Sequence, residues 1–420
     1  MNPKVGLKPM QLDVVIFGGG AAGLCLLDEL VRHGFRVLLL ETAQLGSGQT
    51  VAAQGIIHGG LKYTLQGLLT PSAVHIREMP QFWRACLSGS QKPDLRGTRI
   101  RSEFCYLWRT KSLTSRLGMM GAMFGLQVTP KTLSVHERPG VLSNCSGTVA
   151  RLDEQVIAPD SFVQVLAVEH RERLLQIDCN REVDFAVSGP GKITAIRLMR
   201  PGSSQSLNLR PKQVVFTAGV GNAELRKRVG LDPNEMQRRP LHMVMLRGPL
   251  PHFNGHCVDG AKTRVTITSD TDSAGRTVWQ LGGQIAEDGV GLDEATLIEK
   301  TRDELNVIFP ALNLSNVEVA TYRIDRAERK TPNNKRPDNV QLICEGNCIT
   351  AWPTKLALAP QLAKQVADRL GLLSSMGKLD LSMLSNWPRP TVAKPPWETQ
   401  RKWYALQSGT PHTAFSNKAA

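Results

Sequence analysis

The sequence predicts an α/β protein with two domains, one on a parallel sheet assembled from separated segments and one α+β domain with an antiparallel sheet. Three observations predict this. An apolar run, a glycine-rich turn, a helical pattern and a second apolar run follow one another within residues 13–41. Another buried strand pattern comes only at 213–221. Strand-like runs separated by turns, with a single helix, then fill 237–324, which favours antiparallel pairing.

The stretch 13–41 carries the clearest motif. Its expected elements are a strand at 14–17, a helix at 21–33 and a strand at 36–40. Gly18, Gly20 and Gly23 have the spacing G-x-G-x-x-G, which allows a tight turn, close approach of a phosphate, and close helix packing. Glu41 ends the second strand, where a carboxylate can accept hydrogen bonds from ribose hydroxyls. This combination predicts a dinucleotide site, with the pyrophosphate at the helix N-terminus.

The segment after Glu41 favours FAD over NAD as the dinucleotide. Residues 46–67 are rich in glycine and small residues and are too long for a simple connection, so their backbone can follow an extended ligand. Polar side chains of this segment are candidates for function, and His58 is equally well explained as a base or as a packed structural histidine. The cofactor contacts expected in and around it are Ala22, Thr42, Gln49, Thr50 and Gly55.

Composition limits the class of protein. The chain of 420 residues is long enough for two domains, and its net charge of +14 favours an anionic substrate, a membrane surface or nucleic acid. The charge is spread along the chain, which weakens the nucleic-acid interpretation. Eight cysteines without a CxxC pair indicate a reducing compartment, and Cys344 and Cys348 are best read as ordinary thiols. We expect no metal site.

The remaining elements follow in order. Residues 112–126, apolar and rich in Met and Gly, suit a partly buried helix better than a lid or a membrane-touching helix. Residues 148–157 read as a charged surface segment, and Asp293 as a helix N-cap. We expect helices at 71–87, 159–171, 293–308 and 361–370, and strands at 104–108, 174–177, 183–187, 193–198, 213–217, 241–247, 264–269, 277–285, 317–324, 340–343 and 348–351.

Domain limits follow from these elements. The strand at 213–217 leads into Ala218 and Gly219, a second point where the backbone can approach a cofactor. A charged run, 325–330, follows the strand at 317–324. We assign residues 11–95, 145–235 and 336–375 to a discontinuous Rossmann-like FAD-binding domain, and residues 96–144 and 236–335 to the substrate domain. Residues 376–420 form a tail that drapes over the surface.

These motifs resemble the FAD-dependent oxidoreductases of the D-amino-acid-oxidase-like superfamily, and glycerol-3-phosphate dehydrogenase most. The stretch IHGGLKY at 57–63 is similar to that family's I-H-G-G-L-R-Y, with Lys62 in place of the arginine. Thr354, Lys355 and Leu356 are similar to its G-K-[LI]-T segment, although Pro353 and Thr354 replace two glycines. The resemblance implies FAD as cofactor, with Thr354 and Leu356 beside it.

The resemblance implies hydride transfer from a small anionic hydroxy compound, a polyol phosphate or 2-hydroxy acid, to flavin N5. Lys355 is the first candidate for stabilising negative charge on the reduced ring or the substrate oxygen, against a loop lysine without a role. Lys62, Tyr63 and Arg323 are candidates for binding the substrate anion, although Arg323 is equally well explained by a sheet neighbour. His58 is the candidate base.

Three functions compete at this stage. The first is the dehydrogenase just described, the second an amine or amino-acid oxidase, and the third a flavoprotein that acts on RNA or binds FAD without turnover. Lys62 and Lys355 favour the first. Because no NAD(P) motif follows the first glycine motif, we expect electrons to pass to a quinone, oxygen or another protein. We expect no nucleic-acid partner and a cytoplasmic location, with weak peripheral contact with the inner membrane as an alternative.

Overall fold

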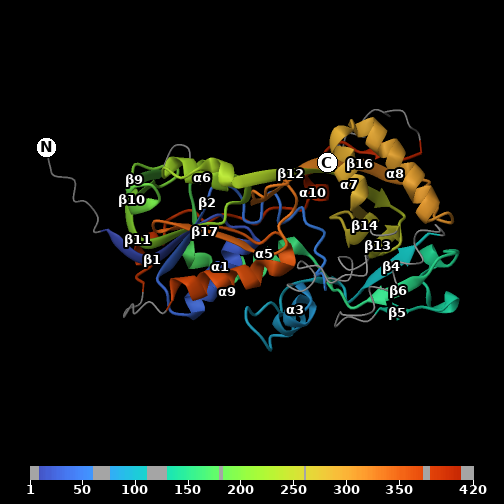
Figure 1. The fold of residues 1–420 in the computed structure, drawn as a ribbon, viewed down its shortest axis with the longest axis horizontal. Helices are drawn as coiled ribbons and strands as arrows, with labels where there is room; N and C mark the ends of the chain where they lie inside the picture. Colours follow the sequence, from blue (N-terminus) through green and yellow to red (C-terminus); the bar gives the residue numbers. More distant parts are fainter. Residues whose placement is uncertain are drawn as a thin grey trace.

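The structure is a computed structural model that describes residues 9–59, 76–110, 130–178, 183–259, 262–371 and 379–407. Two sheets divide these residues between two lobes that lie side by side (Figure 1). Lys62, Tyr63 and the segment 112–126 lie outside the described residues, so the expectations for them stay predictions.

The first sheet is largely parallel. β1 (Met10–Phe17) lies between β11 (Ser206–Phe216) and β2 (Val37–Glu41), and Val15 pairs with Val214 on one side and Leu38 on the other. Beyond β2 the sheet continues with β8 (Leu174–Gln176). Beyond β11 it continues with β18 (Cys348–Trp352) and then β17 (Gln341–Glu345). β10 (Lys192–Met199) also pairs with β11, and β9 (Val183–Gly189) pairs with β10. Strands from distant parts of the chain therefore pair here, which confirms the predicted fold class.

Helices cover one face of this sheet (Figure 1). They are α1 (Ala21–Arg32), α5 (Pro159–Glu169) and α9 (Ala359–Leu370), and α3 (Met79–Leu87) packs near them. α1 buries Leu24, Leu26, Leu27 and Leu30 completely, and each such side chain contributes about 1.5–3 kcal/mol. The opposite face packs against the β9–β10 hairpin and α6 (Asn222–Arg228). The expected helix at 71–87 is described only from residue 76, which is helical, and a turn at 77–78 precedes α3.

The second sheet is mostly antiparallel. Its order is β19 (Tyr404–Ala405), β16 (Glu318–Arg329), β12 (Met236–Gly248), β15 (Thr277–Gly282), β14 (Lys262–Thr271), β13 (Gly255–Asp259), β4 (Cys105–Arg109), β6 (Val149–Leu152) and β5 (Lys131–Thr132). α8 (Glu294–Ile308) packs on it. Asp293 caps this helix as predicted, because its carboxylate accepts a hydrogen bond of 2.8 Å from the Thr296 amide.

β12 and β16 are longer than predicted, and together they form a ribbon that reaches toward the first lobe (Figure 1). The charged run 325–330 was expected to follow the strand, but its residues through Arg329 continue β16 opposite the start of β12. Cross-strand ion pairs explain the difference. The Arg239 guanidinium contacts both carboxylate oxygens of buried Glu328, at 2.7 and 2.8 Å, so charged side chains are paired rather than solvated.

Three further expectations were wrong. Residues 148–157 are not a surface segment, because β6 and β7 (Val156–Ile157) bury their apolar side chains, and β7 pairs with β3 (Ile100–Ser102). β6 also pairs with β4 in the second sheet, although we expected residues from 145 to belong to the first domain. The strand expected at 277–285 stops at Gly282, since Gly283 has φ of +86° and α7 (Gln284–Asp288) begins there.

The tail connects the two lobes. The Leu45 amide donates to the Thr391 carbonyl over 2.8 Å, and the Ala393 amide donates to the Leu45 carbonyl over 2.9 Å. Further along, α10 (Pro396–Thr399) leads to β19, which pairs with β16 in the second sheet. The tail therefore does more than drape over the surface, because it is hydrogen-bonded to both sheets.

Candidate active site

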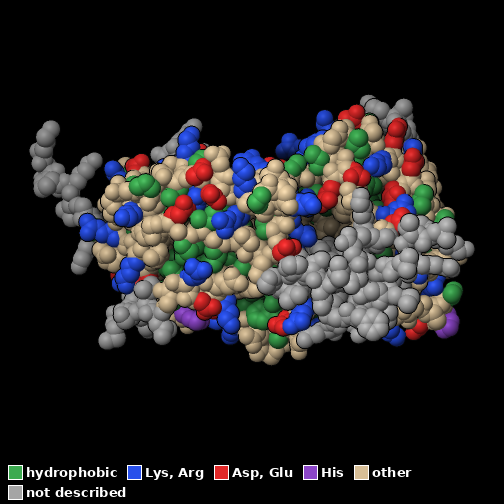
Figure 2. Space-filling view, viewed as in Figure 1, with side chains coloured by type: hydrophobic (Ala, Val, Ile, Leu, Met, Phe, Trp, Pro, Cys, Tyr) green, Lys and Arg blue, Asp and Glu red, His purple; other side chains and the backbone are tan. Residues whose placement is uncertain are grey.

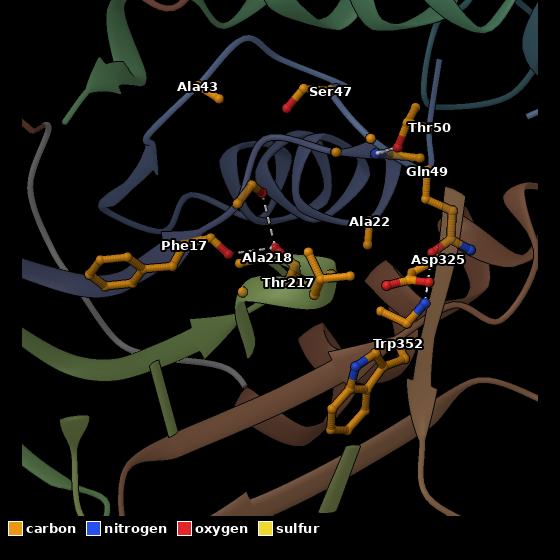
Figure 3. Close-up of a pocket in the computed structure, with 18 of the residues that line it drawn as sticks. Phe17, Ala22, Ala43, Ser47, Gln49, Thr50, Thr217, Ala218, Asp325 and Trp352 are labelled. Carbon is orange, nitrogen blue, oxygen red and sulfur yellow. Dashed lines mark hydrogen bonds between the residues drawn. The ribbon is translucent and has the colours of Figure 1, made fainter. Parts of the chain in front are cut away.

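A cavity of about 1000 Å³ runs along the carboxyl ends of the parallel strands and extends to β16. In Figure 3, Ala43 and Ser47 mark one part of its wall and Trp352 another, with Ala22 and Ala218 between them. Ligands of open α/β sheets bind at this edge. Twelve of the residues expected from the sequence line it: Gly18, Gly20, Ala22, Glu41, Thr42, Gln49, Thr50, Ala218, Gly219, Arg323, Lys355 and Leu356.

The glycine turn after β1 is closely packed. Gly18 has φ of +104°, and a Cβ atom there would lie 2.5 Å from the Cα of Ala218. Gly23 does not line the cavity, because a Cβ atom there would lie 1.9 Å from the Gly18 carbonyl oxygen. Gly55 also lies outside the cavity wall and packs against the backbone of Ile157. Gly23 and Gly55 therefore shape the turn and the loop, whereas Gly18 also lines the cavity.

The N-terminus of α1 opens into the cavity. Its N-cap, Gly20, makes no side-chain capping bond, and the first turn holds no acidic residue. The Thr50 hydroxyl accepts a hydrogen bond of 3.1 Å from the Ala21 amide, which brings the loop that follows β2 against the helix end (Figure 3). Backbone amides and the helix dipole at such an end favour a phosphate group.

Glu41 is held at the end of β2 by backbone amides. One carboxylate oxygen accepts from the Gly19 amide at 2.6 Å and the other from the Ala43 amide at 2.9 Å. The carboxylate is partly exposed at the cavity wall and has further lone pairs for hydroxyl groups.

The other end of the cavity is formed by the segment after β18. Trp352 is buried and lines the cavity, and its indole Nε1 has no hydrogen-bond partner among the described residues. Such an unpaired buried donor is uncommon in folded proteins. Lys355 follows it in the chain and is 9% exposed. A buried aromatic side chain and a cation therefore both line this end of the cavity.

Thr354, expected beside the cofactor, does not line the cavity. It adopts φ of +60°, a conformation that costs a β-branched residue about 1–3 kcal/mol. Its buried hydroxyl oxygen also has no partner among the described residues. The strain sits directly before Lys355 and sets the direction in which the chain enters the cavity wall.

Arg323, expected to bind the substrate, is used by the fold. Its guanidinium donates to the carbonyls of Val290 and Leu292, both at 2.8 Å. Arg323 lines the cavity from β16, but these N–H groups are hydrogen-bonded to the loop before α8. The observed contacts of Arg323 therefore agree with the alternative interpretation, in which it pairs with a neighbour in the fold.

A second cavity of about 400 Å³ adjoins the first and shares Gln49, Ala53 and Ile324 with it. Two arginines from the second lobe, Arg326 and Arg336, line it. Burial, and then the neighbouring Arg239, lower the pKa of Arg326, and Glu287 opposes this shift with a contact of 3.1 Å. An anionic ligand beside Arg326 would be electrostatically favoured.

His58 lies on the wall of neither cavity. Its Nδ1 faces the carboxylate of Glu154 at 3.4 Å, and His256 faces the same oxygen at 3.6 Å. Burial raises the pKa of Glu154, but the two imidazoles outweigh burial and the pKa lies well below its ordinary value. The structure therefore brings His58 to a buried carboxylate rather than to the cavity that holds Lys355.

Comparison with known proteins identifies the family of this chain. The sequence profile of the family described as DAO, FAD dependent oxidoreductase, matches residues 13–349. A protein named probable FAD-dependent oxidoreductase PA4991, from Pseudomonas aeruginosa, is 38% identical over 402 residues, 93% of this chain and 98% of its own. Its crystal structure covers the same shares with a TM-score of 0.77. The chain belongs to the family of FAD-dependent oxidoreductases.

More distant relatives and structural neighbours are named for different substrates. Glycerol-3-phosphate dehydrogenase from Mycobacterium leprae is 40% identical, but over only 72 residues, 16% of this chain and 12% of its own. The structure of glycine oxidase from Geobacillus kaustophilus covers 90% of this chain and 98% of its own, with 16% identity and a TM-score of 0.60. The second likeness concerns the fold alone.

The first cavity fits the cofactor of the family, FAD. Glu41 suits the ribose, the amides at the start of α1 suit the pyrophosphate, and Lys355 suits the polar edge of the ring system. The sequence analysis did not single out Trp352, Arg326 or Glu154. A lone tryptophan, an arginine within a charged run and a glutamate in an expected surface segment have no characteristic spacing to other functional residues. Within the described ranges, no helix is long and apolar enough to cross a membrane.

Proposed function

We propose that this oxidoreductase oxidises a small anionic hydroxy compound, a polyol phosphate or a 2-hydroxy acid, bound in the second cavity. The observation that carries the proposal is the position of Arg326 and Arg336 in a small cavity that shares Gln49, Ala53 and Ile324 with the cofactor cavity. Arginine binds carboxylate and phosphate through two parallel hydrogen bonds, and a partly buried site strengthens them.

The residues divide the work between the two cavities. FAD, when bound, supplies a two-electron acceptor for the hydride of the substrate. Arg326 binds the anionic group and is kept in place by Glu287. Lys355 holds positive charge at the end of the first cavity, where it stabilises negative charge that develops during oxidation. Gln49 and Ala53 of the loop 49–54 line both cavities, and Gln54 of this loop donates to the carbonyls of Thr266 and Gln280 at 2.9 Å each.

Arg323 and His58 have smaller roles in this proposal than their sequence context implied. Arg323 is bonded to two loop carbonyls, and His58 is turned toward Glu154. We therefore assign the anion to Arg326 and do not use His58 as the base. Lys62 and Tyr63 remain candidates for further contacts with the substrate.

An amino-acid substrate is the second candidate. Glu287 lines the second cavity together with Arg326. A carboxylate beside a guanidinium could face the ammonium group of an amino acid whose carboxylate binds the arginine. The fold is shared with glycine oxidase, but the direct pairing of Glu287 with Arg326 leaves this carboxylate less available, so we place this candidate second.

A substrate panel tests the proposal. Anaerobic enzyme is mixed with 2-hydroxy acids, polyol phosphates, amino acids and uncharged polyols, and bleaching of the flavin absorbance is followed. Bleaching by an anionic hydroxy compound, and not by its uncharged analogue, supports the proposal. Bleaching by amino acids alone would replace it with the second candidate. Reoxidation by a quinone or by oxygen then identifies the electron acceptor, which we expect not to be NAD.

A further inference from the structure

Three side chains from distant parts of the sequence meet outside both cavities. They are His58 from the loop after β2, Glu154 from the connection between β6 and β7, and His256 from β13. One ligand atom of each residue lies within 4.8 Å of the others. Nδ1 of His58 and Nε2 of His256 both face Oε2 of Glu154. Glu154 and His256 are buried, and the side chain of His58 is 16% exposed.

The spacing of these atoms is long for hydrogen bonds. The two imidazole nitrogens lie 3.4 and 3.6 Å from the same Glu154 oxygen, whereas N–H···O bonds have a mode of about 2.9–3.0 Å. The distances fit a different arrangement. Ligands at about 2.0–2.2 Å from a tetrahedral zinc ion are separated by about 3.4 Å, the edge of the tetrahedron. Both nitrogens therefore stand where two ligands of one metal would stand relative to the carboxylate.

The surroundings fix the orientation of two of the ligands. The other oxygen of Glu154 accepts a hydrogen bond of 2.6 Å from the Gly59 amide. Nδ1 of His256 lies 2.9 Å from the Thr266 hydroxyl. With Nδ1–H donated to Thr266, Nε2 carries the lone pair that a metal ligand needs. Such outer hydrogen bonds orient histidine and carboxylate ligands in metal sites.

We propose that His58, Glu154 and His256 bind a divalent metal ion of the zinc class. Two imidazoles and one carboxylate are a ligand set that zinc accepts, with water in the fourth position. His58, the partly exposed ligand, gives the ion a path into the cluster. The ion joins the loop after β2 to the second sheet, so its binding stabilises the contact between the two lobes. The proposal does not depend on the identity of the substrate.

Metal binding is measured on FAD-loaded protein without an affinity tag. The protein is dialysed against a chelator and then titrated with Zn²⁺ by calorimetry, and metal content is determined after gel filtration. We expect one zinc ion per chain. Glu154→Gln and His256→Gln should each weaken binding by at least a hundredfold. Thr266→Val, which removes only the outer hydrogen bond, should weaken binding about 10–100-fold.

Controls separate this site from other ligands and from misfolding. His242 is also a buried histidine, bonded to the Gly289 carbonyl and the Thr321 hydroxyl, so His242→Gln should keep zinc binding. Cys344 is exposed, and Cys344→Ser should keep it too. Zinc should raise the melting temperature of the wild type but not that of Glu154→Gln. The proposal is overturned if the wild type takes up no zinc, or if Glu154→Gln and His256→Gln bind zinc as the wild type does.

Discussion

The Gly19 amide donates a hydrogen bond of 2.6 Å to the carboxylate of Glu41, so the glycine turn after β1 and the end of β2 are fixed to each other. The carboxylate is thereby oriented at the wall of the cofactor cavity before any ligand arrives. Preorganised charged acceptors bind hydroxyl groups without a further ordering cost.

Glu41→Gln should therefore weaken FAD binding. Hydrogen bonds to a charged group contribute about 1.5–3 kcal/mol, which corresponds to roughly 10–150-fold in the dissociation constant. The measurement is the quenching of FAD fluorescence on titration of the apoprotein. Glu172→Gln, at an exposed position after α5, is the control and should bind FAD as the wild type does. Equal affinities for Glu41→Gln and wild type would show that Glu41 does not contact the cofactor.

Arg326 provides a test of the second cavity that leaves the first intact. Arg326→Met keeps an apolar stem but removes the guanidinium, so kcat/KM for the substrate found in the panel should fall about 10–150-fold. FAD content should not change, because Arg326 does not line the first cavity. Steady-state kinetics and the flavin absorbance measure the two effects. Arg302→Met on α8 is the control, and an unchanged kcat/KM in Arg326→Met would place the anion elsewhere.

The backbone conformation and the buried hydroxyl of Thr354 should lower the unfolding free energy of the protein. Its φ of +60° and its unpartnered buried hydroxyl both oppose folding. Thr354→Gly removes both at the cost of about 0.5–1 kcal/mol of extra chain entropy, and the net gain in unfolding free energy should be about 1–3 kcal/mol. Thr354→Ala removes the hydroxyl and the γ-methyl but keeps a Cβ atom at the positive φ, so it should gain less. Urea denaturation at saturating FAD measures both, and a destabilised Thr354→Gly would contradict this account.

Much of the first sheet could be predicted from the sequence because its signals are local. Gly18, Gly20 and Gly23 lie within six residues of one another, and Glu41 follows at a distance that one helix and one strand dictate. Gly18, Gly20 and Glu41 line the cavity, and their position there could be predicted from the direction of the turn after β1. Local patterns also predicted the cap at Asp293.

Features that depend on partners far along the chain could not be predicted. The continuation of β16 through Glu328 depends on Arg239, and a run of charges by itself reads as solvated. Glu154 has no local signal either, because its partners His58 and His256 are separated from it by about a hundred residues on each side. A cluster gathered from three elements has no local ligand spacing, so a sequence pattern does not indicate it, and the expected absence of a metal site stays a prediction.

Asp28 predicts a pH dependence of stability. Burial raises the pKa of this carboxyl, but hydrogen bonds from His170 at 3.0 Å and Arg32 at 2.8 Å outweigh burial and leave the pKa below its ordinary value. A carboxyl whose pKa is lower in the folded state stabilises the fold above its unfolded pKa, about 3.9, and this stabilisation is lost as the pH falls through the folded value.

Asp28→Asn should thus lower the unfolding free energy at pH 7 by about 1.5–3 kcal/mol, and the difference from wild type should shrink below about pH 4. Denaturant titrations at pH 7, 5 and 3.5 measure it. Asp303→Asn, at an exposed position of α8, should show no such difference. If the difference in unfolding free energy between Asp28→Asn and the wild type stays constant with pH, the effect comes from the packing of the side chain and not from its charge.

Lys355 is the cation that the chain places at the end of the cofactor cavity, next to Trp352 and after the strained Thr354. Its side chain is 9% exposed, so its charge acts in a medium of low dielectric constant. Removing one such preorganised group typically costs about 2.7–4 kcal/mol, on the order of a hundred- to a thousandfold in rate. Lys355→Met keeps the apolar stem and removes only the charge.

We therefore expect Lys355→Met to fold and to keep its FAD, while stopped-flow reduction of the flavin by the true substrate slows about 100–1000-fold. Lys355→Arg should recover only part of the rate, because a planar guanidinium does not replace a compact ammonium group. Lys364→Met, on the exposed side of α9, is the matched control and should be reduced at the wild-type rate. If Lys355→Met is also reduced at that rate, the charge serves the loop and the reacting atoms lie away from this end of the cavity.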